Sequence, residues 1–327
     1  MSKIIEAVLP FNNFFFKSCF FNEFFSIMEY YRINLLNILG FTDGYYRLSE
    51  NGQLEFEYID DIESSYSKEM LINLAGMAGM TVKINEEEAS LLFIEDEIDR
   101  LHPVISIIDC YYLPYRTDTY KRKHSIHPIL IKGYDEREEV YYIIDQVNDE
   151  SLTYSNYTIS YNDFKQGTNA LSIHENDDYF NYLSSYSYNK NISLSLPEIK
   201  KEVIGIKKAH LQKFHQGKYA IQKYIEVFTV NDIIDNMDSV IIQLNSIVNF
   251  KLIEKHKIEL LFLPPDDEEL TKLIENILSC WKIFRRDLYM FYYSKKTSAL
   301  ALYDTLVDLL DRIYLYEDKY CELFQQI

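Results

Sequence analysis

Several features common in other proteins are scarce in this sequence of 327 residues. It has only 9 glycines and 7 prolines, which argues against a collagen-like chain and against a long disordered linker. No run of about twenty uninterrupted apolar residues occurs, so we expect no membrane-spanning helix. The phenylalanine-rich N-terminus has neither a basic segment before it nor a small-residue cleavage site after it, so we expect no signal peptide.

Positive charge is scarce as well. The chain has 33 lysines and arginines against 51 aspartates and glutamates, which gives a formal net charge of -18. A field of this sign repels a polyanion, so the composition argues against a nucleic-acid binder that depends on neutralising phosphates.

Closely spaced cysteines and cofactor motifs are absent too. The four cysteines, Cys19, Cys110, Cys280 and Cys321, show no close pairing of the zinc or redox kind, and a reduced cytoplasmic setting is the simplest interpretation. The sequence has no P-loop, no glycine-rich dinucleotide fingerprint and no pair of histidines with the spacing of a zinc helix. We expect neither a bound cofactor nor a metal site.

The remaining composition is that of a globular protein large enough for two domains. Runs rich in Val, Ile, Leu and Tyr predict strands at residues 45–48, 54–59, 104–112, 128–132 and 140–144. Beyond a polar linker at 184–195, apolar residues recur at helical spacing, as from Ile274 to Phe284 and from Leu302 to Ile313. We therefore predict an α+β domain at 1–185 and an all-helical domain at 196–327.

Cys19 stands where a helix is expected to begin. The stretch from Asn12 to Cys19 leads into an apolar segment, Phe20 to Leu39, which we interpret as one helix. Unpaired N–H groups and the positive end of the dipole at a helix start favour a thiolate. The alternative is a buried structural cysteine, and we interpret Cys110 in this way because it lies in an apolar strand.

A histidine and an acid are expected to meet at the end of a hairpin. Residues 133–138 read as a turn, so antiparallel pairing of the strands on either side would bring His127 and Asp145 to the same end. His124 is the rival histidine. The alternative for Asp145 is an ordinary strand-ending aspartate that starts a turn.

These features together resemble a known family. A cysteine that opens an N-terminal helix, the run from Pro103 to Arg116, the two histidines and Gly133-Tyr134-Asp135 are similar to the N-terminal domain of the butirosin biosynthesis protein H family. The resemblance covers roughly residues 10 to 170. It implies a papain-like cysteine-peptidase fold and an acyl transfer, in natural-product biosynthesis, from a carrier protein to an acceptor.

The resemblance also implies roles for individual residues. Cys19 would be the nucleophile and His127 the general base, and Asp145 would orient the imidazole, in the chain order of papain-like enzymes. Asn13, or Asn12 as the fallback, stands where the papain-like pattern has the glutamine of the oxyanion hole. A turn or cap residue is the alternative for this asparagine.

A basic segment precedes the histidines in an otherwise acidic chain. Arg116, Lys121, Arg122 and Lys123 would suit an acidic acyl or peptidyl carrier protein and the phosphate of its phosphopantetheine arm. An ordinary solvated loop is the alternative. The second substrate would be a small-molecule amine or hydroxyl, and the sequence leaves a homodimer open.

Two other functions remain open at the level of the sequence. A peptidase or amide hydrolase would use the same three residues, with water in place of the acceptor. A non-catalytic module that binds a carrier protein or a peptide would keep Cys19 as an unreactive thiol of raised pKa.

Overall fold

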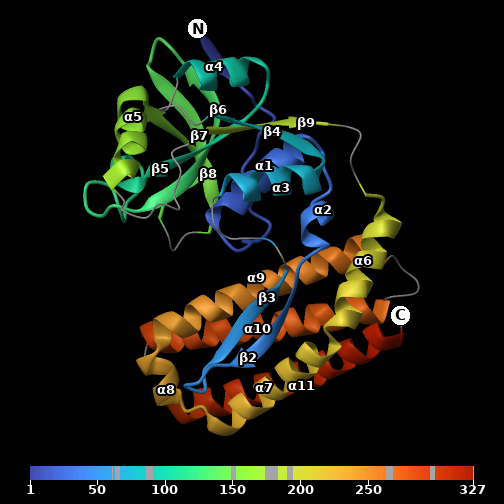
Figure 1. The fold of residues 1–327 in the computed structure, drawn as a ribbon. Helices are drawn as coiled ribbons and strands as arrows, with labels where there is room; N and C mark the ends of the chain where they lie inside the picture. The colour runs from blue at the N-terminus through green and yellow to red at the C-terminus, as the bar shows by residue number, and fades with distance from the viewer. Residues whose placement is uncertain are drawn as a thin grey trace. The chain divides into compact units, whose positions relative to one another are not determined.

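The chain divides into two compact units in a computed structural model (Figure 1). Residues Met1–Ile38 and Ile62–Ser193 form the first, which we call the sheet unit, and residues Leu39–Asp61 and Leu194–Ile327 form the second, the helical unit. The structure describes residues 1–60, 62, 67–85, 91–148, 152–173, 183–189, 194–262, 268–294 and 299–326.

The sheet unit is built on one antiparallel sheet. Within the described residues it has seven strands in the order β4-β9-β5-β6-β7-β8, with β1 added to β6. The strands are β1 (Ser2–Ile4), β4 (Met80–Asn85), β5 (Val104–Asp109), β6 (Ile126–Asp135), β7 (Val140–Gln146), β8 (Tyr154–Ser160) and β9 (Leu183–Tyr188).

Two predictions for these strands need correction. Strand β9 lies at the start of the segment predicted as a polar linker, and it pairs with β4 and β5 because Ser184 and Ser185 are buried and hydrogen-bonded. Ser185 Oγ, for example, donates to Glu97 at 2.9 Å. Strand β5 ends at Asp109, since the Asp109 side chain accepts from the Tyr111 N–H and starts a 3-10 turn there, η1 (Cys110–Tyr112).

Helices complete the sheet unit, and the helix predicted from Phe20 to Leu39 is two helices. Arg32 has a φ of 56°, which breaks the helix, and the Asn34 side chain accepts from the Leu36 N–H and starts the second one. The helical segments are α1 (Cys19–Tyr30), α2 (Leu36–Leu39), α3 (Lys68–Ala78), α4 (Leu91–Asp99), η1, α5 (Tyr161–Asn169) and η2 (Ala170–Ile173).

Helix α1 is held by buried phenylalanines. Burial of one such side chain contributes about 1.5–3 kcal/mol, so the set fixes the helix firmly. Asn22 Nδ2 donates to Phe14 O at 2.9 Å, and Ser26 Oγ accepts from Phe11 N at 3.0 Å, which ties the preceding segment to the helix. The buried rings are Phe11, Phe14, Phe16, Phe20, Phe21, Phe24 and Phe25.

The helical unit confirms the prediction of a helical C-terminal region, and the apolar positions named for 274–284 and 302–313 lie in its two longest helices. None of the described helices is both long and apolar enough to cross a membrane. The helices are α6 (Leu196–Ala209), α7 (Leu211–Val227), α8 (Val230–Asp235), α9 (Met237–Leu261), α10 (Glu268–Ser294) and α11 (Ala299–Gln326).

A hairpin from the N-terminal half of the chain packs with these helices. Strands β2 (Asp43–Leu48) and β3 (Leu54–Ile59) lie against α7 and α9, whereas the sequence placed residues 39–61 in the first domain. At Gly217 of α7, a Cβ would lie only 2.9 Å from the Tyr46 carbonyl oxygen, so a side chain there would push the helix away from the hairpin.

A buried ion-pair network joins the hairpin to the helices. Lys207 Nζ lies 2.7 Å from Asp43 and 2.6 Å from Glu254, and Lys251 Nζ lies 2.6 Å from Glu254 and 2.8 Å from Glu317. All five side chains are buried. Burying charges is unfavourable unless they are paired, so the hairpin and the helices depend on each other.

Candidate active site

Cys19 is the first residue of α1, as predicted. Lys17, with a φ of 52°, turns the chain sharply into the extended Ser18, the N-cap. Cys19 is partly exposed, whereas Cys110, Cys280 and Cys321 are buried, so the prediction of Cys110 as a core residue is confirmed. The thiol therefore lies at the positive end of a helix dipole with access to solvent.

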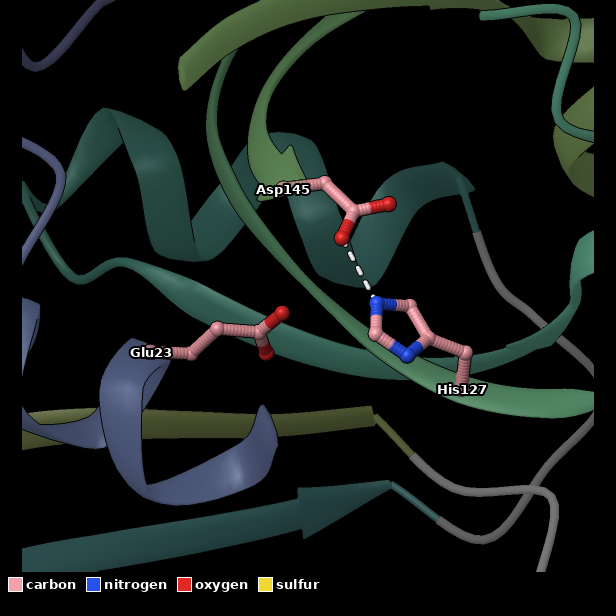
Figure 2. A group of neighbouring side chains, drawn as sticks. All are labelled: Glu23, His127 and Asp145. Carbon is pink, nitrogen blue, oxygen red and sulfur yellow. Dashed lines mark hydrogen bonds and ion pairs between the residues drawn. The ribbon is translucent and has the colours of Figure 1, made fainter. Parts of the chain in front are cut away.

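His127 on β6 and Asp145 on β7 meet as the hairpin predicts. The two strands pair antiparallel, with Leu130 opposite Ile144, and His127 Nε2 lies 2.6 Å from Asp145 Oδ1 (Figure 2). Both side chains are buried, with 4% and 0% of their surface exposed. A hydrogen bond this short in a buried site fixes the orientation of the imidazole.

The thiol is coupled to this pair. Asp145 takes the Nε2 side of the ring, which leaves Nδ1 for the hydrogen bond between His127 and Cys19. Burial raises the pKa of Cys19, but the charge of His127 and hydrogen bonds with His127 and Tyr154 outweigh it and leave the pKa below its ordinary value. Burial lowers the pKa of His127, but the charges of Asp145 and Cys19 raise it well above its usual range.

These opposite pKa shifts predict the pH dependence of alkylation. A lowered thiol pKa means that thiolate persists as the pH falls, so the iodoacetamide rate should have its midpoint below the roughly 8.5 of a free cysteine. His127→Gln should move the midpoint upward. Alkylation measured by mass at Cys19 across pH tests this, and a wild-type midpoint at or above the free-cysteine value would contradict it.

Asp145 is held in turn by its neighbours. The Tyr115 hydroxyl donates to Asp145 Oδ2 at 2.6 Å, and the main-chain N–H of Gln146 donates to Oδ1 at 2.6 Å. Arg116 Nη1 lies 3.9 Å from Oδ1 and 3.4 Å from His127 Nε2. The carboxylate therefore presents a fixed oxygen to the imidazole.

The position of Arg116 corrects one prediction. Its side chain is fully buried and contacts Asp118 through Nε at 3.2 Å and Nη2 at 3.2 Å. A buried guanidinium between two carboxylates has no surface to offer a partner protein. Arg116 thus belongs to the support of the His127–Asp145 pair and is not part of an exposed basic segment.

The other three residues of that segment, Lys121, Arg122 and Lys123, are exposed. Lys121 Nζ lies over the ring of Tyr112, 4.3 Å from its centroid, and Arg122 Nη1 donates to Thr117 O at 3.0 Å. These contacts hold the side chains in a defined loop, which we call the basic loop.

His124, the rival histidine, has another partner. Its Nδ1 lies 2.6 Å from Asp109 Oδ2, and its ring stacks on Tyr111 with the centroids 4.3 Å apart. Asp109 also accepts from the Ser125 N–H at 3.1 Å. His124 therefore helps to shape the basic loop, and His127 is the histidine that pairs with Asp145.

Residues 52–146 match the family model of butirosin biosynthesis protein H, N-terminal. The resemblance, predicted over roughly residues 10 to 170, is confirmed over this shorter stretch, and we call the family the butirosin H family. The matched stretch includes His127, Asp145 and the basic loop but begins after Cys19. A search of curated proteins finds no match to the chain. The family match supports an enzyme of biosynthesis with an acyltransferase-like role.

The two asparagines before Cys19 differ in their contacts. Asn12 Oδ1 accepts from the Tyr154 N–H at 2.7 Å, and Asn12 Nδ2 donates to Tyr154 O at 3.1 Å, so its side chain fixes the start of β8. Asn13 is exposed.

Another amide, which the sequence did not predict, contacts the thiol. Gln146 is buried, and its Nε2 donates to Cys19 Sγ at 3.4 Å. The Tyr154 hydroxyl also bonds to the thiol and lies 3.4 Å from Cys19 O. The only sequence signal for Gln146 is its position directly after Asp145.

Glu23 is a second residue of the site that the sequence did not predict. It lies on α1, four residues after Cys19, and its carboxyl points toward His127 and Asp145 (Figure 2). It is completely buried, and burial raises its pKa well above the ordinary value. In the sequence it stands among phenylalanines, where its neighbours give no sign of its place beside the histidine.

Proposed function

We propose that this protein is a cysteine acyltransferase. It takes an acyl group from a carrier-protein thioester, holds it as a thioester on Cys19 and passes it to an amine or hydroxyl of a small molecule. The observation that carries the proposal is the partly exposed Cys19 thiol, of lowered pKa, bonded to His127, whose Nε2 is held by Asp145. The butirosin H family match supports the biosynthetic context.

The first half of the reaction loads the enzyme. The Cys19 thiolate attacks the thioester carbonyl and forms a new C–S bond, and the carbonyl electrons move to the oxygen. When the tetrahedral intermediate collapses, the bond to the carrier thiol breaks, and His127 gives its proton to that thiolate. The products are acyl-Cys19, neutral His127 and the free carrier thiol.

The second half restores the enzyme. Neutral His127 takes the proton of the acceptor amine or hydroxyl as it attacks the acyl-Cys19 carbonyl. Collapse of this intermediate breaks the bond to sulfur, releases the amide or ester and returns the Cys19 thiolate beside the His127 imidazolium. Asp145 stabilises that imidazolium and keeps the ring in the orientation that both steps need.

Gln146 is our candidate for the oxyanion donor, together with the Cys19 N–H, which has no acceptor within the first turn of its own helix. The side-chain amide of Gln146 is buried beside the sulfur and already donates to it. Gln146→Ala should therefore lower kcat by about 10²–10³-fold, the usual loss for an oxyanion donor. Steady-state kinetics measure this, with Gln166→Ala, an exposed glutamine of α5, as the control. Equal rates for the two variants would contradict the assignment.

The basic loop is our candidate for the carrier contact. Lys121, Arg122 and Lys123 are exposed positive charges on a chain of net charge -18, and an acidic carrier protein would complement them. Reversing all three to glutamate should raise KM for a carrier thioester by about tenfold and leave kcat/KM for a small thioester mimic unchanged.

The matched control reverses two exposed basic residues elsewhere in the sheet unit, Arg137 and Lys165. The control variant should have the same KM for the carrier thioester and the same kcat/KM for the small mimic as the wild type. A basic-loop variant that loses activity on both substrates, or on neither, would count against docking at this loop.

Kinetics with two varied substrates test the proposed reaction as a whole. A ping-pong enzyme gives parallel double-reciprocal lines when carrier thioester and acceptor are varied. If the rate is independent of every acceptor and free acid accumulates, the protein is a hydrolase. If no donor is consumed, the protein is a binding module and the proposal fails.

A further inference from the structure

The carboxyl of Glu23 is an unexplained group in the centre of the sheet unit. Its exposed fraction is 0%, and neither Oε1 nor Oε2 has a hydrogen-bond partner in the described part of the chain. Leaving a buried polar group unpaired costs about 1–3 kcal/mol, and more for a charged one. Native proteins rarely carry such a group without a ligand, water or ion to satisfy it.

The group does not stand alone. One carboxylate oxygen of Glu23, one nitrogen of His127 and one oxygen of Asp145 all lie within 4.8 Å of one another (Figure 2). They come from α1, β6 and β7, and all three side chains are buried. Phenylalanine packing fixes α1 and strand pairing fixes β6 and β7, so the three donors are held in place before any ligand arrives.

The donor set indicates what would bind. Two carboxylates and a neutral imidazole carry two negative charges, which a divalent cation balances. One nitrogen and two oxygens suit Zn²⁺ or a neighbouring first-row transition metal, whereas Mg²⁺ and Ca²⁺ prefer oxygen donors alone. We propose that Glu23, His127 and Asp145 form a binding site for a divalent transition-metal ion, with Zn²⁺ as its representative.

Protonation of Glu23 would satisfy its buried carboxyl oxygens less well than a bound cation would. A neutral carboxyl would offer an O–H in place of a charge, but neither oxygen has a hydrogen-bond partner among the residues that the structure describes. A cation shared by the three residues would instead bond directly to the carboxylate of Glu23.

Occupancy of this site would exclude catalysis. Nε2 of His127 faces Asp145 at 2.6 Å, so it is the nitrogen that a shared ion would take. Nε2 has one lone pair, which can hold either the proton shared with Asp145 or the metal. On binding, that proton passes to solvent, and the hydrogen bond from His127 to Asp145 is lost. The metal-bound protein is therefore an inactive form.

Zinc titration of an inactive variant tests the site apart from the proposed reaction. Cys19→Ala removes a thiol that would bind Zn²⁺ by itself, and the titration needs no turnover. By isothermal titration calorimetry, we expect one saturable Zn²⁺ site in this variant. Adding Glu23→Gln, which keeps the shape of the side chain, should weaken that site by about 100-fold or more, since loss of an outer-shell partner alone costs 10–100-fold.

The control is Cys19→Ala with Glu29→Gln, an exposed glutamate on the same helix, which should bind Zn²⁺ as Cys19→Ala does. No saturable binding to Cys19→Ala, or equal affinity with and without Glu23, would overturn the proposal. If circular dichroism shows that the Glu23 variant does not fold, Asp145→Asn in the Cys19→Ala background removes another ligand and gives the same test. A protein that forms acyl-Cys19 but binds no Zn²⁺ would refute this site and leave the proposed function intact.

Discussion

Replacing His127 by glutamine is expected to lower the rate of Cys19 acylation by about 10³-fold or more. The change removes the imidazolium that stabilises the thiolate and the acid that protonates the leaving thiol, and general acid–base catalysis alone is worth about 10²–10⁴-fold. Rapid-quench sampling followed by intact-mass spectrometry measures the acylation rate directly.

The matched control is His124→Gln, three residues away. His124 bonds to Asp109 and stacks on Tyr111, so its loss should alter the basic loop and leave the acylation rate with a small mimic nearly unchanged. Similar losses in the two variants would mean that a general disturbance of this region, and not the pairing with Asp145, sets the rate.

Replacing Glu254 by leucine should have the largest effect on stability. Glu254 accepts from Lys207 and Lys251 at 2.6 Å each inside the helical unit, and removal of one partner from a buried ion pair typically costs about 3–5 kcal/mol. Denaturant unfolding measures this loss. Glu259→Leu, at an exposed residue of the same helix that lies 3.6 Å from Lys255, is the control and should cost about 1 kcal/mol or less.

Glu254 also makes the stability of the helical unit depend on pH. Burial raises the pKa of Glu254, but Lys207 and Lys251 outweigh it and lower the pKa to about 2. Its contribution to stability should therefore be complete above the unfolded-state value of about 4.3 and be lost as the pH falls toward 2. An unfolding midpoint in acid that is the same for wild type and Glu254→Leu would contradict this assignment.

The sequence predicted the parts of the site that local rules determine. A hairpin brings the residues at its two ends together whatever surrounds it, so the pairing of His127 with Asp145 followed from the predicted turn. That turn was predicted at 133–138 and lies at 136–139, because β6 continues to Asp135. The position of Cys19 at a helix start followed from the apolar segment after it. Both predictions depend on contacts within or next to a single element.

The sequence did not predict the contacts that cross between distant elements. Glu23 on α1 and Gln146 on β7 come together at the site because α1 packs against β6, the neighbour of β7 in the sheet, and neither residue has a local pattern that shows this. Arg116 was grouped with the basic residues that begin five positions later, at Lys121, yet Asp118 and Asp145 hold it inside the protein.

The position of the hairpin of β2 and β3 also depends on contacts with distant parts of the chain. The two strands were predicted, but Asp43 pairs with the buried Lys207, which also pairs with Glu254, and both of these residues lie far along the chain. Residues 39–61 therefore read as part of the N-terminal domain, although they pack in the helical unit.

Intact-mass spectrometry after incubation with a panel of acyl carrier thioesters and small acyl thioester mimics tests the central claim most directly. We predict an added acyl mass on the wild type that is absent from Cys19→Ala and that disappears when an amine or hydroxyl acceptor is added. An adduct of the same extent on Cys19→Ala, or no adduct with any donor on a wild type whose Cys19 alkylates no faster than a free thiol, would contradict the account.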